Sequence, residues 1–208
     1  MTRWDDLEPV WQRAFELAWE AYGRNTTPVG AVVADGAGRI VAEGRNARYA
    51  GAGVPLAGSH IAHAEVVALG SLSSERSYPD HVLVTTLEPC LLCAGAAVMS
   101  SVGEVRFAGV DPYGGASAFP PGLNAHLRRG LTAFTGPRAD WPGTFAAALH
   151  VEFYLRRKPD GHVVAAYRAA APDVVGVATA FAEMGLFAAA SADAPVGVSF
   201  DRAAAGRR

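Results

Sequence analysis

Four residues in the first half of the chain have the side-chain types and the spacing of a metal-dependent catalyst. His63 and Glu65 are separated by one residue, and Cys90 and Cys93, the two cysteines of the sequence, are separated by two. A Cys-x-x-Cys at the start of a helix places both sulfurs on one side of the first turn, where the helix dipole favours the thiolate form that binds zinc. His63, at the start of a different helix, would supply a third ligand.

The predicted ligand set, His63, Cys90 and Cys93, leaves one tetrahedral position of a zinc ion free for water, which is the arrangement of a catalytic site. Zinc lowers the pKa of water bound there towards about 7, so that hydroxide is available at neutral pH. Glu65 is poorly placed for a fourth ligand but lies near the same ion. It could accept the proton of the water and return it to a ring nitrogen and to departing ammonia. The residues therefore predict a catalytic zinc site with a carboxyl group that transfers protons.

Each half of this pattern alone has a less specific interpretation. A single Cys-x-x-Cys could be redox-active or part of a structural zinc site, and a single His-x-Glu on a helix is most often a surface feature. Their combination, in a strand–helix context around both halves and with no further cysteine, favours the catalytic interpretation.

The elements that must position these residues alternate between helices and strands. Helical spacing of apolar residues is found over residues 6–22, 62–72, 90–99 and 144–156, and more weakly within 117–129. Strands are predicted from alternating or β-branched runs at 29–34, 39–45, 81–86, 104–108 and 131–135. This order predicts a layered α/β sheet with helices on both faces.

The chain becomes rich in alanine after Arg156-Arg157-Lys158-Pro159. In this segment we expect a strand near Val163, a helix over 174–189 and a loose tail. The predicted organisation is a zinc deaminase domain over residues 1–158 and an alanine-rich C-terminal extension, 159–208, packed on the same domain. Several aromatic residues of this half could close over a substrate or form ordinary core: Trp141, Phe145, Phe153, Tyr154 and Phe187.

Composition and charge limit the classes of protein to which the chain can belong. Half of its 208 residues are hydrophobic, and 18 basic against 20 acidic residues give a formal charge of −2. Proteins that hold nucleic-acid backbones usually carry a clear basic excess, so this charge disfavours a nucleic-acid substrate. The polar N-terminus lacks the apolar core of a signal peptide, and no apolar run reaches the roughly 20 residues that span a bilayer. We expect a cytoplasmic protein with reduced thiols and no membrane segment.

Several blocks of the sequence resemble the cytidine and deoxycytidylate deaminase superfamily. His-x-Glu with Pro-Cys-x-x-Cys is the signature of zinc nucleobase deaminases. Further blocks, over roughly residues 7–135, are similar to the branch that contains tRNA adenosine deaminases and guanine deaminases: 28–33, 43–46, 86–90 and 93–96. The resemblance implies a three-layer αβα cytidine-deaminase-like fold with a mixed five-stranded sheet, a bound Zn²⁺ and assembly as a homodimer.

The resemblance also implies residues that contact the substrate. Asn46 matches the asparagine that hydrogen-bonds the base, and the backbone of Ala64 and Cys90 would border the reacting carbon. Asp111 is a candidate for reading a base edge. A turn or capping role for Asn46 and a plain loop position for Asp111 remain open. The residues just before His63, including His60, depart from the pattern of the tRNA-acting members.

Three functions are consistent with these features. The first is deamination of a small nucleobase or nucleoside in a closed pocket, with a purine such as guanine, guanosine or adenosine favoured over cytosine or cytidine. The second is adenosine-to-inosine editing of tRNA, which needs a basic surface; the compact basic clusters are Arg128-Arg129 and Arg156-Arg157-Lys158. The third is a partner-binding protein with structural zinc, which the presence of Glu65 disfavours because an inactive homologue is expected to lose its proton shuttle.

Overall fold

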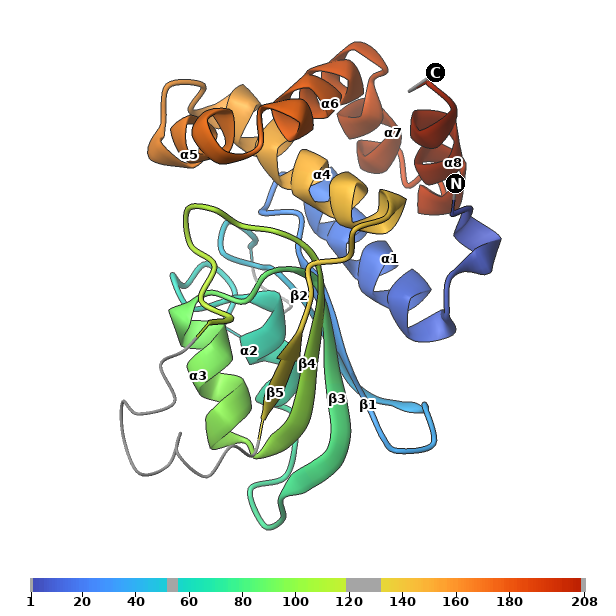
Figure 1. Ribbon diagram of the computed structural model, residues 1–208. Helices are drawn as coiled ribbons and strands as arrows, with labels where there is room; N and C mark the ends of the chain where they lie inside the picture. The colour runs from blue at the N-terminus through green and yellow to red at the C-terminus, as the bar shows by residue number, and fades with distance from the viewer. Residues whose placement is uncertain (1, 52–55, 119–131, 207–208) are drawn as a thin grey trace.

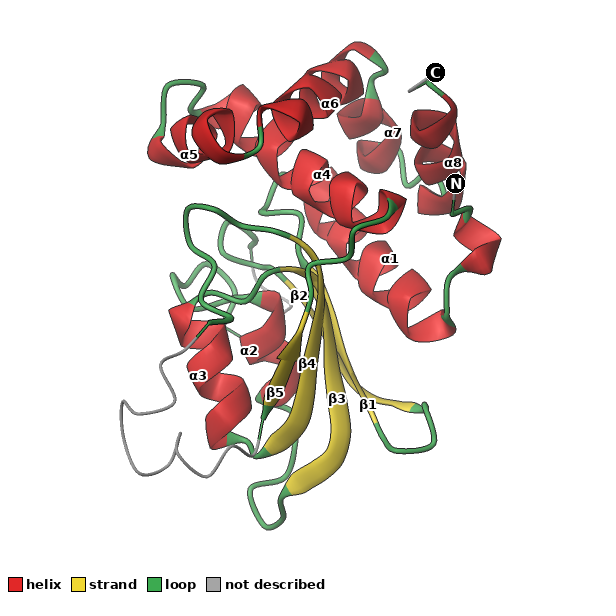
Figure 2. Cartoon of the chain, in the orientation of Figure 1, coloured by secondary structure: helices red, strands yellow, loops and turns green. Residues whose placement is uncertain are grey.

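The computed structural model describes residues 2–51, 56–118 and 132–206. A sheet lies between two layers of helices, and further helices stack beyond one of these layers (Figures 1 and 2). Most of the weak helical pattern within 117–129 lies outside the described residues. Within the described part of the chain, none of the helices combines the length and the apolar character that crossing a bilayer requires.

The sheet has five strands in the order β2-β1-β3-β4-β5 among the described residues. Antiparallel pairing joins β1 to β2 and to β3, whereas β3, β4 and β5 are parallel to one another. The strands are β1 (Gly30–Ala34), β2 (Ile40–Arg45), β3 (Tyr78–Leu87), β4 (Val102–Gly109) and β5 (Ala133–Thr135). The predicted mixed five-stranded sheet is confirmed.

Two helices cover the face of the sheet on which the metal-ligand pattern lies. α2 (Ala64–Leu69) packs against β1 and β2, and α3 (Leu91–Met99) packs against β4 and α2. Each helix begins directly after a predicted ligand, because His63 is the N-cap residue of α2 and Cys90 is that of α3. The packing of these two helices on one sheet therefore fixes the separation of the ligands.

The opposite face of the sheet is covered by α1 (Pro9–Gly23), which packs on β1 and β3, and by α4 (Trp141–Arg157), which packs on β4. A short 3₁₀ helix, Trp4–Asp6, precedes α1. Aromatic rings pack between these two helices, with the centroids of Phe15 of α1 and Phe145 of α4 5.9 Å apart in an edge-to-face arrangement. Such arrangements stabilise aromatic pairs beyond the area that they bury. The three-layer αβα architecture is confirmed.

The described part of the chain beyond Lys158 forms four helices that pack on α1 and α4 (Figure 1). They are α5 (His162–Ala170), α6 (Pro172–Glu183), α7 (Leu186–Ser191) and α8 (Val196–Ala205). α5 and α6 contact α4, and α7 and α8 contact α1. The boundary between a deaminase domain ending at residue 158 and an extension remains a prediction.

The expected secondary structure of this C-terminal segment was wrong in three places. Val163 lies in α5, not in a strand, because the residues after it favour a helix and Tyr167, one helical turn later, is fully buried. The helix expected over 174–189 is interrupted at Gly185, whose φ of 69° is left-handed and ends the first part. The expected loose tail forms α8, because Phe200 has a place in the aromatic core.

Gly44 of β2 sets how closely α2 approaches the sheet. A Cβ atom at this position would lie 2.3 Å from the carbonyl oxygen of Ala64 and 2.7 Å from the backbone nitrogen of Ala68. Any side chain would therefore push the first turn of α2 away from β2. Since that turn carries Glu65 and follows His63, the absence of a side chain at residue 44 positions the predicted site.

Candidate active site

The three predicted ligands converge on one point. The Nδ1 atom of His63 lies 3.5 Å from Cys90 Sγ and 3.4 Å from Cys93 Sγ, and the two sulfurs are 3.5 Å apart. With Zn–S bonds of about 2.3 Å and Zn–N bonds of about 2.0–2.1 Å, ligand atoms around a tetrahedral ion are separated by roughly 3.6–3.8 Å. The observed triangle is close to that size. These three side chains therefore fit one zinc ion as a His/Cys/Cys site.

The two cysteines differ in acidity because they lie in different surroundings. Cys93 is buried, whereas Cys90 is partly exposed at the N-cap of α3. A hydrogen bond between the two sulfurs, with a further one between Cys90 and the His63 ring, lowers the pKa of Cys90 to about 4. The same hydrogen bond and burial raise the pKa of Cys93. One thiolate is thus already favoured before a metal is bound, and zinc ligation requires the second thiol to lose its proton as well.

Glu65 lies beside the ligand set on the first turn of α2. Its carboxyl group is buried, and burial raises its pKa. The hydroxyl of Thr85 on β3 donates a hydrogen bond of 3.1 Å to Oε1. The other oxygen, Oε2, accepts from Cys93 Sγ at 3.3 Å. The strand therefore holds one oxygen of the carboxyl group and leaves the other next to the ligand atoms.

A pocket of about 200 Å³ opens onto this centre. Its walls include the three ligands and Glu65, and two of the three predicted substrate contacts, Asn46 and Asp111, also line it. Ala64 is fully buried, and its carbonyl oxygen packs toward Gly44. Ala64 is not among the described residues that line the pocket, so its role stays a prediction.

The side-chain amide of Asn46 is held in one orientation. Its Oδ1 atom accepts hydrogen bonds from the Thr26 hydroxyl at 3.0 Å and from the backbone N–H of Arg48 at 3.1 Å. Because a backbone N–H can only donate, the oxygen must be the atom on that side. Among the described residues the Nδ2 atom has no hydrogen-bond partner. Asn46 therefore presents the amide as a donor in the pocket.

Asp111 shapes the loop that borders the pocket. Its Oδ1 atom accepts hydrogen bonds from the backbone nitrogens of Tyr113 at 3.0 Å and Gly114 at 3.1 Å, which is an Asx turn. The backbone nitrogen of Asp111 donates to Glu88 Oε2 at 3.2 Å, and Glu88 Oε1 accepts from the Ser117 hydroxyl at 2.6 Å. The carboxylate of Asp111 thus organises its own loop, and a direct contact with substrate stays a prediction.

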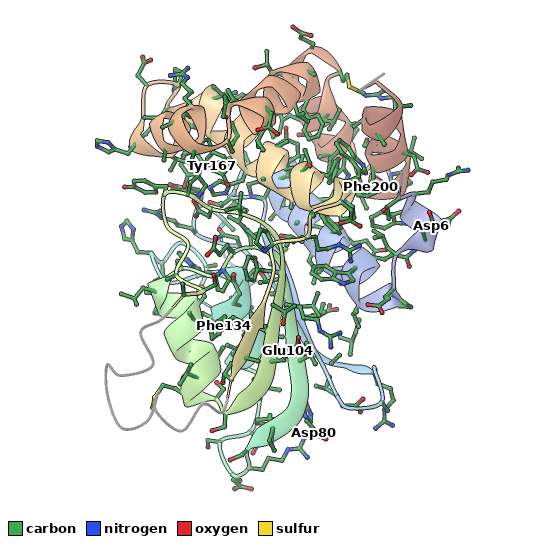
Figure 3. The ribbon with its side chains drawn as sticks, viewed as in Figure 1. Asp6, Asp80, Glu104, Phe134, Tyr167 and Phe200 are labelled. Atoms are coloured by element: carbon green, nitrogen blue, oxygen red, sulfur yellow. The ribbon has the colours of Figure 1, made fainter. Side chains whose placement is uncertain are left out.

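Sequence reasoning named Tyr154 of α4 as a residue that could close over a substrate, but it missed His150 of α4 and Val163 of α5. His150, Tyr154 and Val163 line it. His150 is buried, its Nδ1 atom has no hydrogen-bond partner among the described residues, and burial lowers its pKa. The Tyr167 hydroxyl, labelled in Figure 3, donates to the carbonyl oxygen of Val110 at 2.6 Å and so ties α5 to the pocket loop. The available signal was the spacing of His150 and Tyr154, which places both on one face of a helix.

Residues 5–109, about half of the chain, match the family described as the cytidine and deoxycytidylate deaminase zinc-binding region. This match identifies the class: the chain belongs to the cytidine and deoxycytidylate deaminase family, and the geometry of the three ligands fits a zinc-binding site of that family. The predicted zinc cofactor agrees with the His/Cys/Cys site typical of that family, and the assignment of His63, Cys90 and Cys93 as its ligands stays a prediction that their geometry supports.

Among its relatives, the tRNA-specific adenosine deaminase of Bacillus subtilis is 36% identical over 113 residues, which cover 51% of this chain and 63% of that protein. The tRNA(Ile)-lysidine synthase of Deinococcus radiodurans is 36% identical over 115 residues, which cover 54% of this chain and 19% of that protein. The similarity thus spans less than two thirds of the length of these relatives.

Solved structures share the fold. Guanine deaminase from Nitrosomonas europaea superposes with a TM-score of 0.51 and 23% identity, over 70% of this chain and 84% of that one. A protein crystallised in complex with 2,6-diaminopurine superposes with a TM-score of 0.50 and 25% identity, over 74% of this chain and 82% of that one. The predicted cytidine-deaminase-like fold is confirmed.

Proposed function

We propose that this protein catalyses the hydrolytic deamination of a small purine, as a nucleobase or nucleoside. The observation that carries the proposal is that the zinc ligands, the buried carboxyl group of Glu65 and the oriented amide of Asn46 all border one pocket of about 200 Å³. Sites for drug-sized ligands usually measure about 300–1,000 Å³, so this pocket suits a ligand of about one base.

The chemistry follows from where the side chains lie. Zinc held by the three ligands supplies a Lewis acid that makes water available as hydroxide near neutral pH. The Glu65 carboxylate accepts a proton from the attacking water and delivers it to a ring nitrogen. It then carries the second proton to the exocyclic amine, so that a C–O bond forms, the C–N bond breaks and ammonia leaves. Thr85 holds the other carboxylate oxygen during both transfers.

Recognition of the base is assigned to Asn46, whose Nδ2 atom donates to an acceptor on the ring or on an exocyclic carbonyl group. Thr26 and the backbone of Arg48 hold the amide, so little orientational freedom is lost on binding. The preference for a purine is supported by the likeness to the 2,6-diaminopurine complex and to adenosine deaminases.

The test is ammonia release from guanine, guanosine, adenosine, cytosine and cytidine. We expect turnover of a purine, and we expect Asn46→Asp to lower kcat/KM at least ~10-fold, because a carboxylate in place of the amide leaves the acceptor on the base without a donor. Asn25→Asp, the same substitution at an exposed position outside the pocket, is the control. Zinc-loaded protein that releases ammonia from none of the purines would contradict the proposal.

A second candidate, adenosine-to-inosine editing of tRNA, is favoured by the 36% identity to the tRNA-specific adenosine deaminase of Bacillus subtilis. The same assay with a tRNA anticodon stem-loop separates the two functions. Inosine in the stem-loop, with no ammonia from the small purines, would assign the protein to RNA editing instead.

We also propose that the protein is a homodimer that assembles through α3. This helix exposes Leu91 and Met99, with 67% and 73% of their surface accessible, and a Cβ at Gly95 between them would meet nothing within 4 Å. An apolar stripe with a gap at its centre suits close approach of a second copy.

We expect Met99→Glu to convert a dimer to a monomer in light scattering coupled to gel filtration. Val198→Glu, at an exposed position of α8, is the control. A monomeric wild-type protein, or a Met99→Glu variant that remains a dimer, would rule the interface out.

A further inference from the structure

A second cavity, of about 350 Å³, adjoins the pocket that holds the metal ligands, and we call it the vestibule. Four of its lining residues, Arg48, Tyr113, Tyr154 and Val163, also line the metal pocket. The two spaces therefore lie side by side, which places the vestibule next to a base bound at the metal.

The vestibule is positively charged. Arg48, Arg157 and Lys158 line it, and none of its described lining residues is an aspartate or a glutamate. In the described part of the chain, these three cations form no ion pair. The neighbouring Arg156 differs, because its Nε atom lies 2.8 Å from Oε1 of the buried Glu152. The vestibule therefore gathers three positive charges, although the chain as a whole has a formal charge of −2. Such a local excess of positive charge favours the binding of an anion.

Two of these cations are held in place by neighbouring rings. The guanidinium carbon of Arg157 lies 4.2 Å from the ring centroid of Tyr49, and that of Arg48 lies 5.3 Å from the same centroid. The Nη2 atom of Arg48 is 2.9 Å from His60 Nδ1. Its Nε atom is buried and has no hydrogen-bond partner among the described residues. A guanidinium fork positioned in this way matches the oxygens of a phosphate group.

We propose that the vestibule binds the phosphate of a nucleoside monophosphate whose base lies in the metal pocket. This inference rests on the proposed deamination of a purine and names the form of that substrate. Three cations in a recess are enough to neutralise one dianionic phosphate, whereas a protein that holds a nucleic-acid backbone can make about 6–10 phosphate contacts. The vestibule therefore fits a mononucleotide better than an RNA strand.

The first experiment compares kcat/KM for adenosine and guanosine with that for their 5′-monophosphates at constant ionic strength. We expect kcat/KM to be at least ~10-fold higher for the monophosphate than for the nucleoside. A hydrogen bond between the phosphate and a cation, which the nucleoside cannot form, contributes at least about that factor. Arg157→Gln and Lys158→Gln are each expected to lower this ratio of monophosphate to nucleoside by about tenfold. Arg168→Gln, which removes an exposed cation of α5 that does not line the vestibule, is expected to leave both values unchanged.

The second experiment measures binding of inorganic phosphate to the zinc-loaded protein by calorimetry, with potassium chloride at equal ionic strength as the control. Binding that weakens in Arg157→Gln supports the vestibule independently of turnover. Absence of phosphate binding, or a ratio of monophosphate to nucleoside near one that Arg157→Gln does not change, would overturn it and leave deamination intact. A tRNA stem-loop deaminated far better than any monophosphate would assign these cations to RNA. No ammonia from nucleobases, nucleosides or monophosphates, with phosphate still bound, would overturn the deaminase proposal alone.

Discussion

Glu65→Gln is expected to retain zinc and to lose deaminase turnover by at least ~10²-fold, the usual contribution of a general acid–base group. Glutamine keeps the volume of the side chain and an oxygen that can accept the hydrogen bond from Thr85. It cannot accept a proton from water and return it. The expected change is therefore in kcat, with the zinc content and the melting temperature close to those of the wild type.

The measurements are kcat with the best substrate of the purine panel and zinc content by atomic spectroscopy. Glu75→Gln, at an exposed turn, is the matched control and is expected to behave as wild type. Full activity in zinc-loaded Glu65→Gln would show that the proton is carried by another group.

Cys93→Ala is expected to abolish both zinc binding and activity. Cys93 is buried and lies within 3.5 Å of the ligand atoms of both His63 and Cys90, so its loss leaves two ligands for an ion that takes three from the protein. We also expect a lower melting temperature, because zinc stabilises only the state in which the ligands are brought together.

Ser100→Ala, at the end of the same helix, should keep a full complement of zinc and serves as the control. Removal of zinc from the wild type with a chelator should likewise stop turnover, and zinc added back should restore it. Stoichiometric zinc in purified Cys93→Ala would disprove the ligand assignment. X-ray absorption that finds four protein side chains around the ion in the wild type would disprove an open catalytic position.

The zinc site was predictable because its determinants are local. A cysteine pair at the start of one helix and a histidine at the start of another give the ligand directions without knowledge of the whole fold. The strands were predictable for a similar reason, since β-branched runs such as the one ending at Leu87 suit a buried strand.

The walls of the pocket were not predictable, because they depend on contacts between distant segments. His150 reaches the pocket because α4 packs on the sheet next to β4, which no local pattern of residues reveals. The orientation of the Asn46 amide depends on Thr26, which precedes it by 20 residues. A strand was expected near Val163. The structure has a helix there, because the helix buries Tyr167 against the rest of the protein.

The hydrogen bond from Tyr167 to Val110 joins two parts of the chain with separate tasks. The residues that match the family end at Gly109, one position before this anchor, whereas α4 and α5 lie beyond it. The metal ligands, Glu65 and Asn46 thus belong to one stretch of sequence, and further walls of the pocket, on α4 and α5, belong to another. We expect that exchanging α4 and α5 for those of a relative would change the substrate selectivity and would leave the zinc ligands and Glu65 unchanged.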